Sequence, residues 1–416
     1  MILNYSQTLE QLFARLPMFQ RVGKSAYKAN LDNTWALMKA FDQPQLAFPS
    51  IHIAGTNGKG SVSSAMAAIL AESGFKVGLY TSPHLLDFRE RIQINGQCIS
   101  EQAVVEFYQR VEPLLNDLAP SFFEITVAMA FDYFRKEQVD VAVVEVGLGG
   151  RLDSTNVVES ILGAIASIGH DHMDLLGDSL EKVATEKAGI AKAGIPVVLG
   201  RTYNGCDEVL ESECRRLGAF PIWAEEAPAT WLEAFSLKGH YQKHNLGVVH
   251  RLWQNLPAPF QVDERVALAG LRRTQYWSGI RGRWEILSAA EPFVVCDTGH
   301  NAEAIAVTLN QLRGQAPFED CHFVWGAVGD KDLKGVLSLL PESASYYWCK
   351  PSIPRGLDAG LLSQAAAELN LRGQAFSSVA EAYQAALSKA EPHQAIYVGG
   401  STFVVADLLA HLNGSA

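Results

Sequence analysis

The chain has 416 residues, of which 48% are hydrophobic and 19% charged, and its formal net charge is −11. This composition is typical of a globular protein with a buried core, and the length predicts more than one domain. The acidic charge argues against a broad nucleic-acid-binding surface, but it leaves room for anionic substrates in a local basic pocket.

The N-terminal stretch and the cysteines bear on location. MILNYSQTLEQLFARL has no basic region followed by an apolar block, so it predicts no signal peptide. No uncharged apolar run is long enough to span a bilayer. The six cysteines form no C-x-x-C pair, which argues against a zinc ribbon and favours free thiols in a reducing compartment. We therefore expect a cytoplasmic protein with no membrane or nucleic-acid partner.

The predicted elements alternate between helices and strands. Residues 1–48 are polar and helical in character, and SIHIAG (50–55) predicts a buried strand. KGSVSSAMAAILAESG predicts a helix that stops at Gly74, and FKVGLYTS predicts a second strand. Further apolar strands are expected at 139–150, 161–169 and 195–200. Such alternation predicts an α/β fold with a mostly parallel sheet covered by helices on both faces.

A second, smaller α/β unit is predicted near the C-terminus. SAAEP (288–292) is a candidate linker. After it the alternation restarts, with strands expected in FVVCDTGHN, HFVWGAVGD, SYYWCK and QAIYVGGS. The sequence therefore predicts one domain at 1–287 and another at 288–416.

AGTNGKGS (54–61) lies between the first strand and its helix, where a phosphate-binding loop has to be. Its spelling departs from the common form: Gly60 follows Lys59, the hydroxyl comes at Ser61, and Ile53 stands where the first glycine usually does. Glycines let backbone N–H groups face a phosphate, and Lys59 would neutralise its oxygens. A plain glycine turn is the alternative, but the strand–loop–helix context favours nucleotide binding.

Three further stretches place polar side chains after strands. In EVGLGGRLDSTN, Glu145 ends an apolar strand, a position that suits a Mg²⁺ ligand. GHDHMDLLGD gathers histidines and carboxylates, which favours a metal or phosphate site over structural histidines. In CDTGHN, Asp297 and His300 follow a strand's carboxyl end, where ligands of open α/β sheets bind.

Seven motifs in order carry a family resemblance: AGTNGKGS, TSPHLLDFRERI, SFFEITVAMAF, EVGLGGRLDSTN, HDHMDLLGDSLEKVATEKAGI, GRWE and DTGHN. From about residue 17 to its C-terminus the chain resembles the folylpolyglutamate synthase/dihydrofolate synthase family of the wider Mur ligase group. The resemblance implies a P-loop, Mur-ligase-like, ATP-binding domain at 1–287 and a Rossmann-like glutamate-ligase domain at 288–416. The unusual loop spelling is then the family's own.

The resemblance also implies functional residues. The residues implied to bind ATP are Thr56, Asn57, Gly58, Lys59, Gly60, Ser61, Asn245, Arg283 and Asp297. Two Mg²⁺ ions are implied, with Ser82, Glu145 and His172 as protein ligands. Lys187 in TEKAGI looks like the lysine that the group carbamylates, which would supply a carboxylate near the second metal. Residues with expected catalytic roles are Lys59, Lys187, His172 and His300.

Substrate contacts are implied on three segments and at two single residues. The pterin-bearing substrate is expected near Ser121, Phe122, Phe123 and Glu124, near Leu152, Asp153 and Ser154, and around Arg21–Lys24. His300 and Ser401 are expected to contact the incoming glutamate. The family often has D-G-A-H-N-P where this chain has DTGHNA, so Thr298 and Ala302 alter the turn while Asp297, His300 and Asn301 are kept.

The implied reaction is the ATP-dependent ligation of L-glutamate to dihydropteroate and to reduced folates through an acyl phosphate. A monofunctional folylpolyglutamate synthase is one alternative, and a Mur-type ligase acting on a UDP-linked precursor is another. A non-enzymatic nucleotide switch is a third, but it leaves the second domain and the metal ligands unexplained. A monomer is expected.

Overall fold

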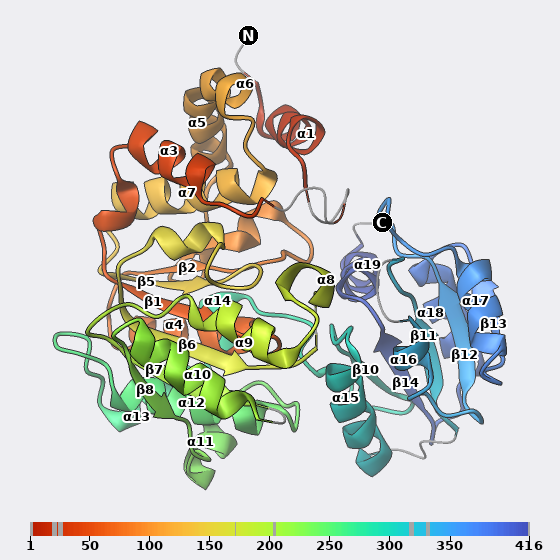
Figure 1. Ribbon diagram of the computed structural model, residues 1–416. Coiled ribbons are helices and arrows are strands. Elements are labelled where there is room, and N and C mark those ends of the chain that lie inside the picture. Colours follow the sequence, from red (N-terminus) through yellow and green to blue (C-terminus); the bar gives the residue numbers. More distant parts are fainter. Residues whose placement is uncertain are drawn as a thin grey trace. The chain divides into compact units, whose positions relative to one another are not determined.

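The computed structural model describes residues 3–18, 23, 28–170, 172–202, 205–315, 320–329 and 333–414. The chain divides into two compact units (Figure 1). The first unit contains the chain up to Ser236 and then Gln242–Ile280, and the second contains Leu237–Tyr241 and everything from Arg281 onward. The division therefore falls before the predicted boundary at 287/288, and a five-residue segment of the second unit interrupts the first.

The first unit is built on an eight-stranded sheet with the order β4-β3-β2-β5-β1-β6-β7-β8. Its strands are β1 (Ser50–Ala54), β2 (Val77–Tyr80), β3 (Ile92–Ile94), β4 (Gln97–Cys98), β5 (Val141–Glu145), β6 (Ser160–Ser167), β7 (Pro196–Arg201) and β8 (Phe220–Trp223). The strands from β2 to β8 in that order pair in parallel, and only β3 and β4 extend the sheet in antiparallel fashion. The mostly parallel sheet is thus confirmed. Sequence patterns missed β3, β4 and β8, which have only two to four residues; β4 and β8 are the edge strands, and β3 lies next to β4.

Helices cover both faces of this sheet (Figure 1). They are α1 (Tyr5–Arg15), α3 (Asp32–Ala40), α4 (Lys59–Glu72), α5 (Glu101–Val111), α6 (Leu115–Leu118), α7 (Phe122–Lys136), α8 (Met173–Leu176), α9 (Leu180–Ala188), α10 (Cys206–Arg216), α11 (Ala229–Ala234), α12 (Gln242–Gln254), α13 (Glu264–Arg272) and α14 (Thr274–Ser278), with short 3₁₀ turns at η2 (Pro44–Leu46), η3 (Phe88–Arg91), η4 (Glu112–Leu114) and η5 (Ser154–Val157). Small residues let α4 lie wholly inside, since every side chain from Ser61 to Ala71 is buried. The helix that follows the phosphate loop is therefore fixed in the core.

The second unit has a six-stranded sheet with the order β13-β12-β11-β14-β10-β9. Its strands are β9 (Glu285–Ser288), β10 (Phe293–Cys296), β11 (His322–Trp325), β12 (Ser345–Cys349), β13 (Gly373–Phe376) and β14 (Ala395–Gly399), and its helices are α15 (Ala302–Gln315), α16 (Leu333–Leu337), α17 (Ala359–Ala367), α18 (Val379–Lys389) and α19 (Thr402–Leu412). Only β9 is antiparallel, and it pairs with β10. The predicted linker SAAEP is therefore wrong as an interdomain segment. It forms the turn between β9 and β10, because those strands pair with each other.

Candidate active site

The loop between β1 and α4 is held by the end of β6. The Thr56 backbone N–H donates to the Ser167 carbonyl at 2.9 Å, and the Thr56 hydroxyl exchanges hydrogen bonds with the Gly169 backbone. Ser167 Oγ accepts the Asn57 N–H and donates to the Asn57 carbonyl, both at 2.9 Å. The loop conformation is thus set by its neighbouring strand before any ligand arrives.

Gly58 shows why this loop requires glycine. Its φ is +90°, and a Cβ built there would lie 2.1 Å from the Asn245 Oδ1 atom. The Asn245 amide in turn donates to the Gln242 side chain at 2.8 Å, and Gln242 donates to Ser61 Oγ at 3.2 Å. Helix α12 therefore packs its first turn against the loop and the start of α4, which brings Asn245 to the predicted phosphate site.

The side chains of two lysines donate hydrogen bonds to the same backbone oxygen. Lys59 Nζ donates to the Gly55 carbonyl at 2.9 Å and to the Thr56 carbonyl at 3.2 Å. Lys187 Nζ, on α9, also donates to the Gly55 carbonyl at 2.9 Å, and Lys187 is buried. Residues separated by more than one hundred positions thus converge on the loop, as expected for a site that binds a highly charged ligand.

The predicted metal ligands follow strands that are neighbours in the sheet. Ser82 follows β2, Glu145 ends β5 and His172 follows β6, and β1 lies between β5 and β6. The Ser82 backbone N–H donates to Glu145 Oε2 at 3.1 Å, and Glu145 is buried. His172 has a φ of +51° and directly precedes α8. Because carboxyl ends of parallel strands share one edge, these residues lie along the edge that carries the loop.

Glu145, Ser82 and His172 offer a carboxylate, a hydroxyl and an imidazole. In the part of the chain that the structure describes, no group of three or more His, Cys, Asp or Glu side chains is arranged to hold a metal ion. A cation bound here would therefore take its remaining ligands from the Ser82 hydroxyl, the nucleotide or water. Mg²⁺ is usually bound in this way.

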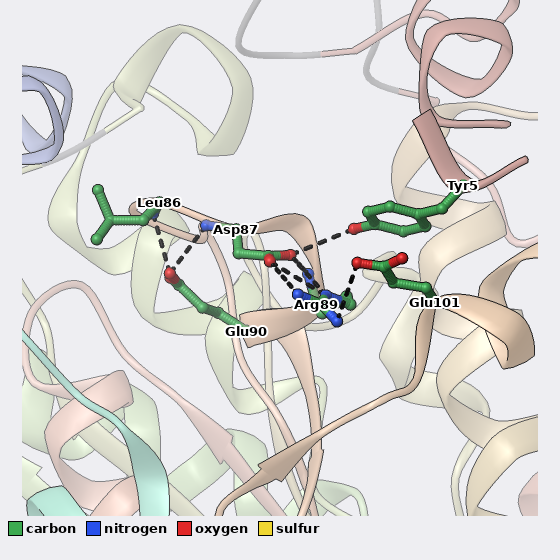
Figure 2. A network of polar contacts seen from close by, with 6 residues as sticks. All are labelled: Tyr5, Leu86, Asp87, Arg89, Glu90 and Glu101. Atoms are coloured by element: carbon green, nitrogen blue, oxygen red, sulfur yellow. Dashed lines mark hydrogen bonds and ion pairs between the residues drawn. The ribbon is translucent and has the colours of Figure 1, made fainter. Parts of the chain in front are cut away.

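The segment that carries Ser82 is stabilised by a polar network, which Figure 2 shows. The Glu90 carboxylate accepts the backbone N–H groups of Leu85, Leu86 and Asp87 at 2.7 to 3.0 Å. The Asp87 carboxylate accepts hydrogen bonds from the Arg89 guanidinium. It also accepts one from the Tyr5 hydroxyl at 3.2 Å, which ties the segment to α1. The Arg89 guanidinium also forms an ion pair with Glu101, with Nη1 3.5 Å from Oε1.

The residues predicted near the pterin are largely engaged within the chain. Ser121 and Glu124 form a capping box at the start of α7, with the Ser121 N–H donating to Glu124 Oε2 at 2.6 Å. Phe122 is buried against other aromatic rings, and a Cβ on Gly147 would meet the Phe123 ring at 2.4 Å. Phe123 therefore lies beside the turn at Gly147 and Phe122 packs into the core, whereas the capping box fixes the start of the helix.

The Asp153 carboxylate fixes the turn after β5. It accepts the Leu148 N–H at 2.8 Å, the Thr155 N–H at 2.9 Å and the Thr155 hydroxyl at 2.5 Å. Burial raises the pKa of Asp153, against the lowering effect of these hydrogen bonds. Leu152 is half-buried and Ser154 is buried. A direct contact between these residues and a substrate stays a prediction.

In the second unit, the DTGHN turn follows β10. Asp297 Oδ2 accepts the Tyr241 hydroxyl and the Trp284 N–H, and Oδ1 accepts the Gly299 N–H, each at 2.7 Å. Burial raises the pKa of Asp297 although these donors favour its anion. Arg283 contacts the Thr298 hydroxyl. Asp297 is thus the acceptor that ties the turn to Tyr241 and Trp284.

His300 and Ser401 also have intramolecular partners. His300 Nδ1 lies 3.0 Å from the Thr298 carbonyl, which can only accept, so Nδ1 carries the hydrogen and Nε2 is the acceptor nitrogen of the neutral ring. Ser401 is the N-cap of α19, where its hydroxyl accepts the Phe403 N–H. Ser401 follows β14, which pairs with β10, so both residues lie at the same edge of the second sheet.

Several residues of the site escaped sequence reasoning. Tyr241 and Gln242 flank the motif of Asn245, but nothing in their residue types marks them out. Glu90 lies within a motif that was noted, and its place three residues after Asp87 is a capping signal. The predicted substrate contacts at Arg21, Val22 and Lys24, and Asp171 of the HDHMD motif, lie outside the described residues.

Comparisons with known proteins show which family the chain belongs to. The chain matches the Mur ligase middle domain over residues 53–199 and the Mur ligase glutamate ligase domain over residues 282–402. It is 33% identical to the dihydrofolate synthase/folylpolyglutamate synthase of Bacillus subtilis, over 77% of this chain and 80% of that protein.

The chain belongs to the dihydrofolate synthase/folylpolyglutamate synthase family of Mur ligases.

Solved structures of this family superpose closely. An Escherichia coli FolC structure in complex with DHPP and ADP has a TM-score of 0.87 and 26% identity, covering 99% of this chain and 98% of that one. A family structure with Mn, AMPPNP and L-glutamate bound has a TM-score of 0.84 and 27% identity, with coverage of 99% and 100%. The chain spans about half the length of its archaeal relatives from Haloferax volcanii and Halobacterium salinarum, both named as probable bifunctional folylpolyglutamate synthase/dihydropteroate synthases. Among the described residues, no helix is long and apolar enough to cross a membrane.

Proposed function

We propose that this chain is an ATP-dependent ligase that joins L-glutamate to dihydropteroate and to reduced folates. The observation that carries the proposal is the convergence of Lys59 and Lys187 on a glycine loop beside Glu145, in a chain whose family relatives bind ADP, AMPPNP and L-glutamate. As in those relatives, the substrates would be small molecules.

The phosphate loop provides the nucleotide site. Lys59 would exchange its two carbonyl partners in the loop for the β- and γ-phosphate oxygens, while the N–H groups at the start of α4 face the phosphates. Ser61, Gly60 and Asn245 complete the contacts around the helix N-terminus. Lys187 would remain on the Gly55 carbonyl.

The donor set around Glu145 fits divalent cations. Ser82, Glu145 and His172 would hold two Mg²⁺ ions together with the nucleotide and water, and a carbamylated Lys187 would add a carboxylate. When bound, the metal ions neutralise charge on the phosphates. The hydrogen bond from the Ser82 N–H holds the Glu145 carboxylate next to Ser82.

The chemistry follows from the weakness of a carboxylate as an electrophile. An oxygen of the pterin substrate's carboxylate attacks the γ-phosphorus of ATP. ADP leaves, and the product is an acyl phosphate. The neutral amine of glutamate then attacks the acyl carbon, and phosphate leaves with formation of the amide. Such phosphoryl transfer needs positioning and charge neutralisation more than a protein nucleophile. His300 Nε2 is the group that would take the amine proton.

The experiment separates the first step from the second. The purified enzyme is incubated with MgATP, dihydropteroate and hydroxylamine, without glutamate. We expect a dihydropteroyl hydroxamate together with ADP, because hydroxylamine traps the acyl phosphate. ADP formation that is independent of the acceptor, with no hydroxamate, would instead support a nucleotide switch. A parallel reaction with tetrahydrofolate in place of dihydropteroate tests the second acceptor.

A further inference from the structure

The turn after β5, residues 147–156, is packed against the end of α9, the helix that carries Lys187. The Arg151 N–H donates to the Glu186 carbonyl at 2.8 Å. A Cβ on Gly150 would lie 2.9 Å from the Lys187 carbonyl oxygen. A Cβ on Gly189 would lie 2.3 Å from the Arg151 Cβ. The backbone of the turn therefore lies directly against the last turn of α9, with room only for glycine at both places.

One buried amide joins the two segments. The Asn156 Nδ2 group donates to the Arg151 carbonyl and to the Gly189 carbonyl, both at 3.0 Å. The Lys192 ammonium donates to Asn156 Oδ1 at 2.9 Å and to the Asn156 carbonyl at 3.0 Å. Because carbonyls only accept and an ammonium only donates, these partners fix which atom of the amide is the nitrogen. Both amide hydrogens are thus used, one on the turn and one on the residue that follows α9.

The segment that Asn156 holds is the base of the Lys187 side chain. Lys187 lies two residues before Gly189, at the end of α9. Its side chain is buried, and its Nζ donates to the Gly55 carbonyl of the phosphate loop at 2.9 Å. A lysine side chain has many rotamers, so its terminal atom keeps its place only if the backbone at its base is held. Asn156 supplies that support from the turn that follows Glu145.

We propose that Asn156 is a positioning residue of the ligase, which acts through Lys187 by joining the end of α9 to the turn after β5. The inference rests on the proposed function, in which Lys187 belongs to the nucleotide and metal site. All of these contacts lie within the first unit. The Asn156 amide is occupied by groups of the chain, so its part is to hold Lys187 in place.

Asn156→Asp tests the amide, because a carboxylate has nearly the same shape but cannot donate. Both bonds to carbonyls are lost, while the Lys192 ammonium keeps its acceptor. Asn95→Asp is the matched control in the first unit. The Asn95 amide donates to the Phe75 carbonyl at 3.1 Å, and its Oδ1 accepts the Val77 N–H at 2.8 Å. Val77 begins β2, so the control lies at the amino end of a strand, away from the edge that carries the loop.

The kinetic test is a double-mutant cycle with Lys187→Ala in the full chain, with MgATP, dihydropteroate and glutamate as substrates. We expect Asn156→Asp to lower kcat about tenfold in the wild-type background, with the KM for ATP changed less than about threefold. In the Lys187→Ala background the same change should lower kcat less than about twofold, because the group that Asn156 positions is gone. Asn95→Asp should keep kcat in both backgrounds. An equal loss in both backgrounds, or wild-type kcat in Asn156→Asp, would overturn the inference.

Asn156→Ser is a second variant, should Asn156→Asp not fold. Serine is neutral and its hydroxyl can replace at most one of the two bonds to carbonyls. We expect a smaller loss of kcat, about threefold, that again disappears in the Lys187→Ala background. A loss that persists there would count against the inference in the same way.

A further measurement does not depend on activity. Amide hydrogen exchange at Arg151 reports whether the turn stays against α9, because this N–H donates to the Glu186 carbonyl. We expect exchange about tenfold faster in Asn156→Asp and unchanged in Asn95→Asp. Unchanged exchange in Asn156→Asp would overturn the inference. If the wild-type enzyme forms no amide, the proposed function has failed, and exchange at Arg151 still tests the link between the turn and α9.

Discussion

At the scale of single residues, Lys187 gives the sharpest prediction. Its ammonium is buried and donates to the Gly55 carbonyl beside the phosphate loop. If it is carbamylated, Lys187→Ala removes an anion and should lower kcat more than a hundredfold, with part of the loss restored by a small carboxylate such as formate or acetate. The measurement is the rate of ADP release with and without added carboxylate.

Lys182 provides a matched control on the same helix. It is exposed and pairs with Asp178, so Lys182→Ala should keep wild-type turnover. Wild-type turnover in Lys187→Ala would remove the lysine from the mechanism. A loss that no carboxylate restores would argue that the ammonium itself is the required species.

His52 gives a prediction about pH and stability. It is fully buried in β1, its Nε2 lies 2.9 Å from Thr155 Oγ1, and burial lowers its pKa to about 3. The unfolded chain takes up a proton on this histidine below its ordinary pKa of about 6.5, whereas the folded chain does not. The stability that neutral His52 contributes is therefore present above about 6.5 and is lost as pH falls from there toward 3.

The measurement is the free energy of unfolding in urea at pH 7.5 and pH 5.0. We expect His52→Gln to lose less stability on acidification than the wild type, by roughly 1.4 kcal/mol per pH unit in that window. Identical pH dependence in the two proteins would mean that His52 is protonated in the fold or neutral in both states.

At the scale of elements, the segment from Thr81 to Arg91 depends on Glu90. Three successive backbone N–H groups, from Leu85 to Asp87, donate to its carboxylate. Glu90→Ala should leave these groups without their acceptor, lower stability by about 1–3 kcal/mol and lower kcat, because Ser82 lies in the same segment. Amide hydrogen exchange at Leu85, Leu86 and Asp87 measures the loss directly.

Glu101→Gln is the control within the same network (Figure 2). Glu101 is exposed and lies 3.5 Å from Arg89, so its change should cost less than about 1 kcal/mol and leave those amides protected. Protection that persists in Glu90→Ala would show that the segment is held by other contacts.

The elements also show how far the sequence could lead. Apolar strands such as β5 and β6, and the alanine-rich helix α4, follow from periodicity and residue type, because a buried strand or helix consists mostly of apolar and small residues. The antiparallel strand β9 could not be predicted from periodicity, because its side chains are only partly buried and a Pro-containing turn follows it. Its partner β10 decides its place, and pairing is not visible in a local pattern.

Some features of the candidate site could likewise be predicted from the sequence, and others could not. Lys59, Glu145 and Asp297 lie at or shortly after the carboxyl ends of strands, so the rule that ligands meet there singled out each of them as a candidate. Thr56 was implied only by the family resemblance. The contact of Asn245 with Gly58 and the bond of Tyr241 to Asp297 join residues that are far apart in sequence. Neither could be predicted from spacing, because each depends on how a helix or a connecting segment packs.

At the scale of the whole molecule, we propose that the energy of ATP is used to join glutamate to a pterin-bearing acid. The most direct test is to incubate the full-length enzyme with MgATP, dihydropteroate and L-glutamate, and to measure ADP and the glutamyl amide in the same samples. We predict equal amounts of both products, and neither amide nor more than trace ADP when dihydropteroate is left out. Release of ADP without any amide in the complete mixture would contradict this proposal.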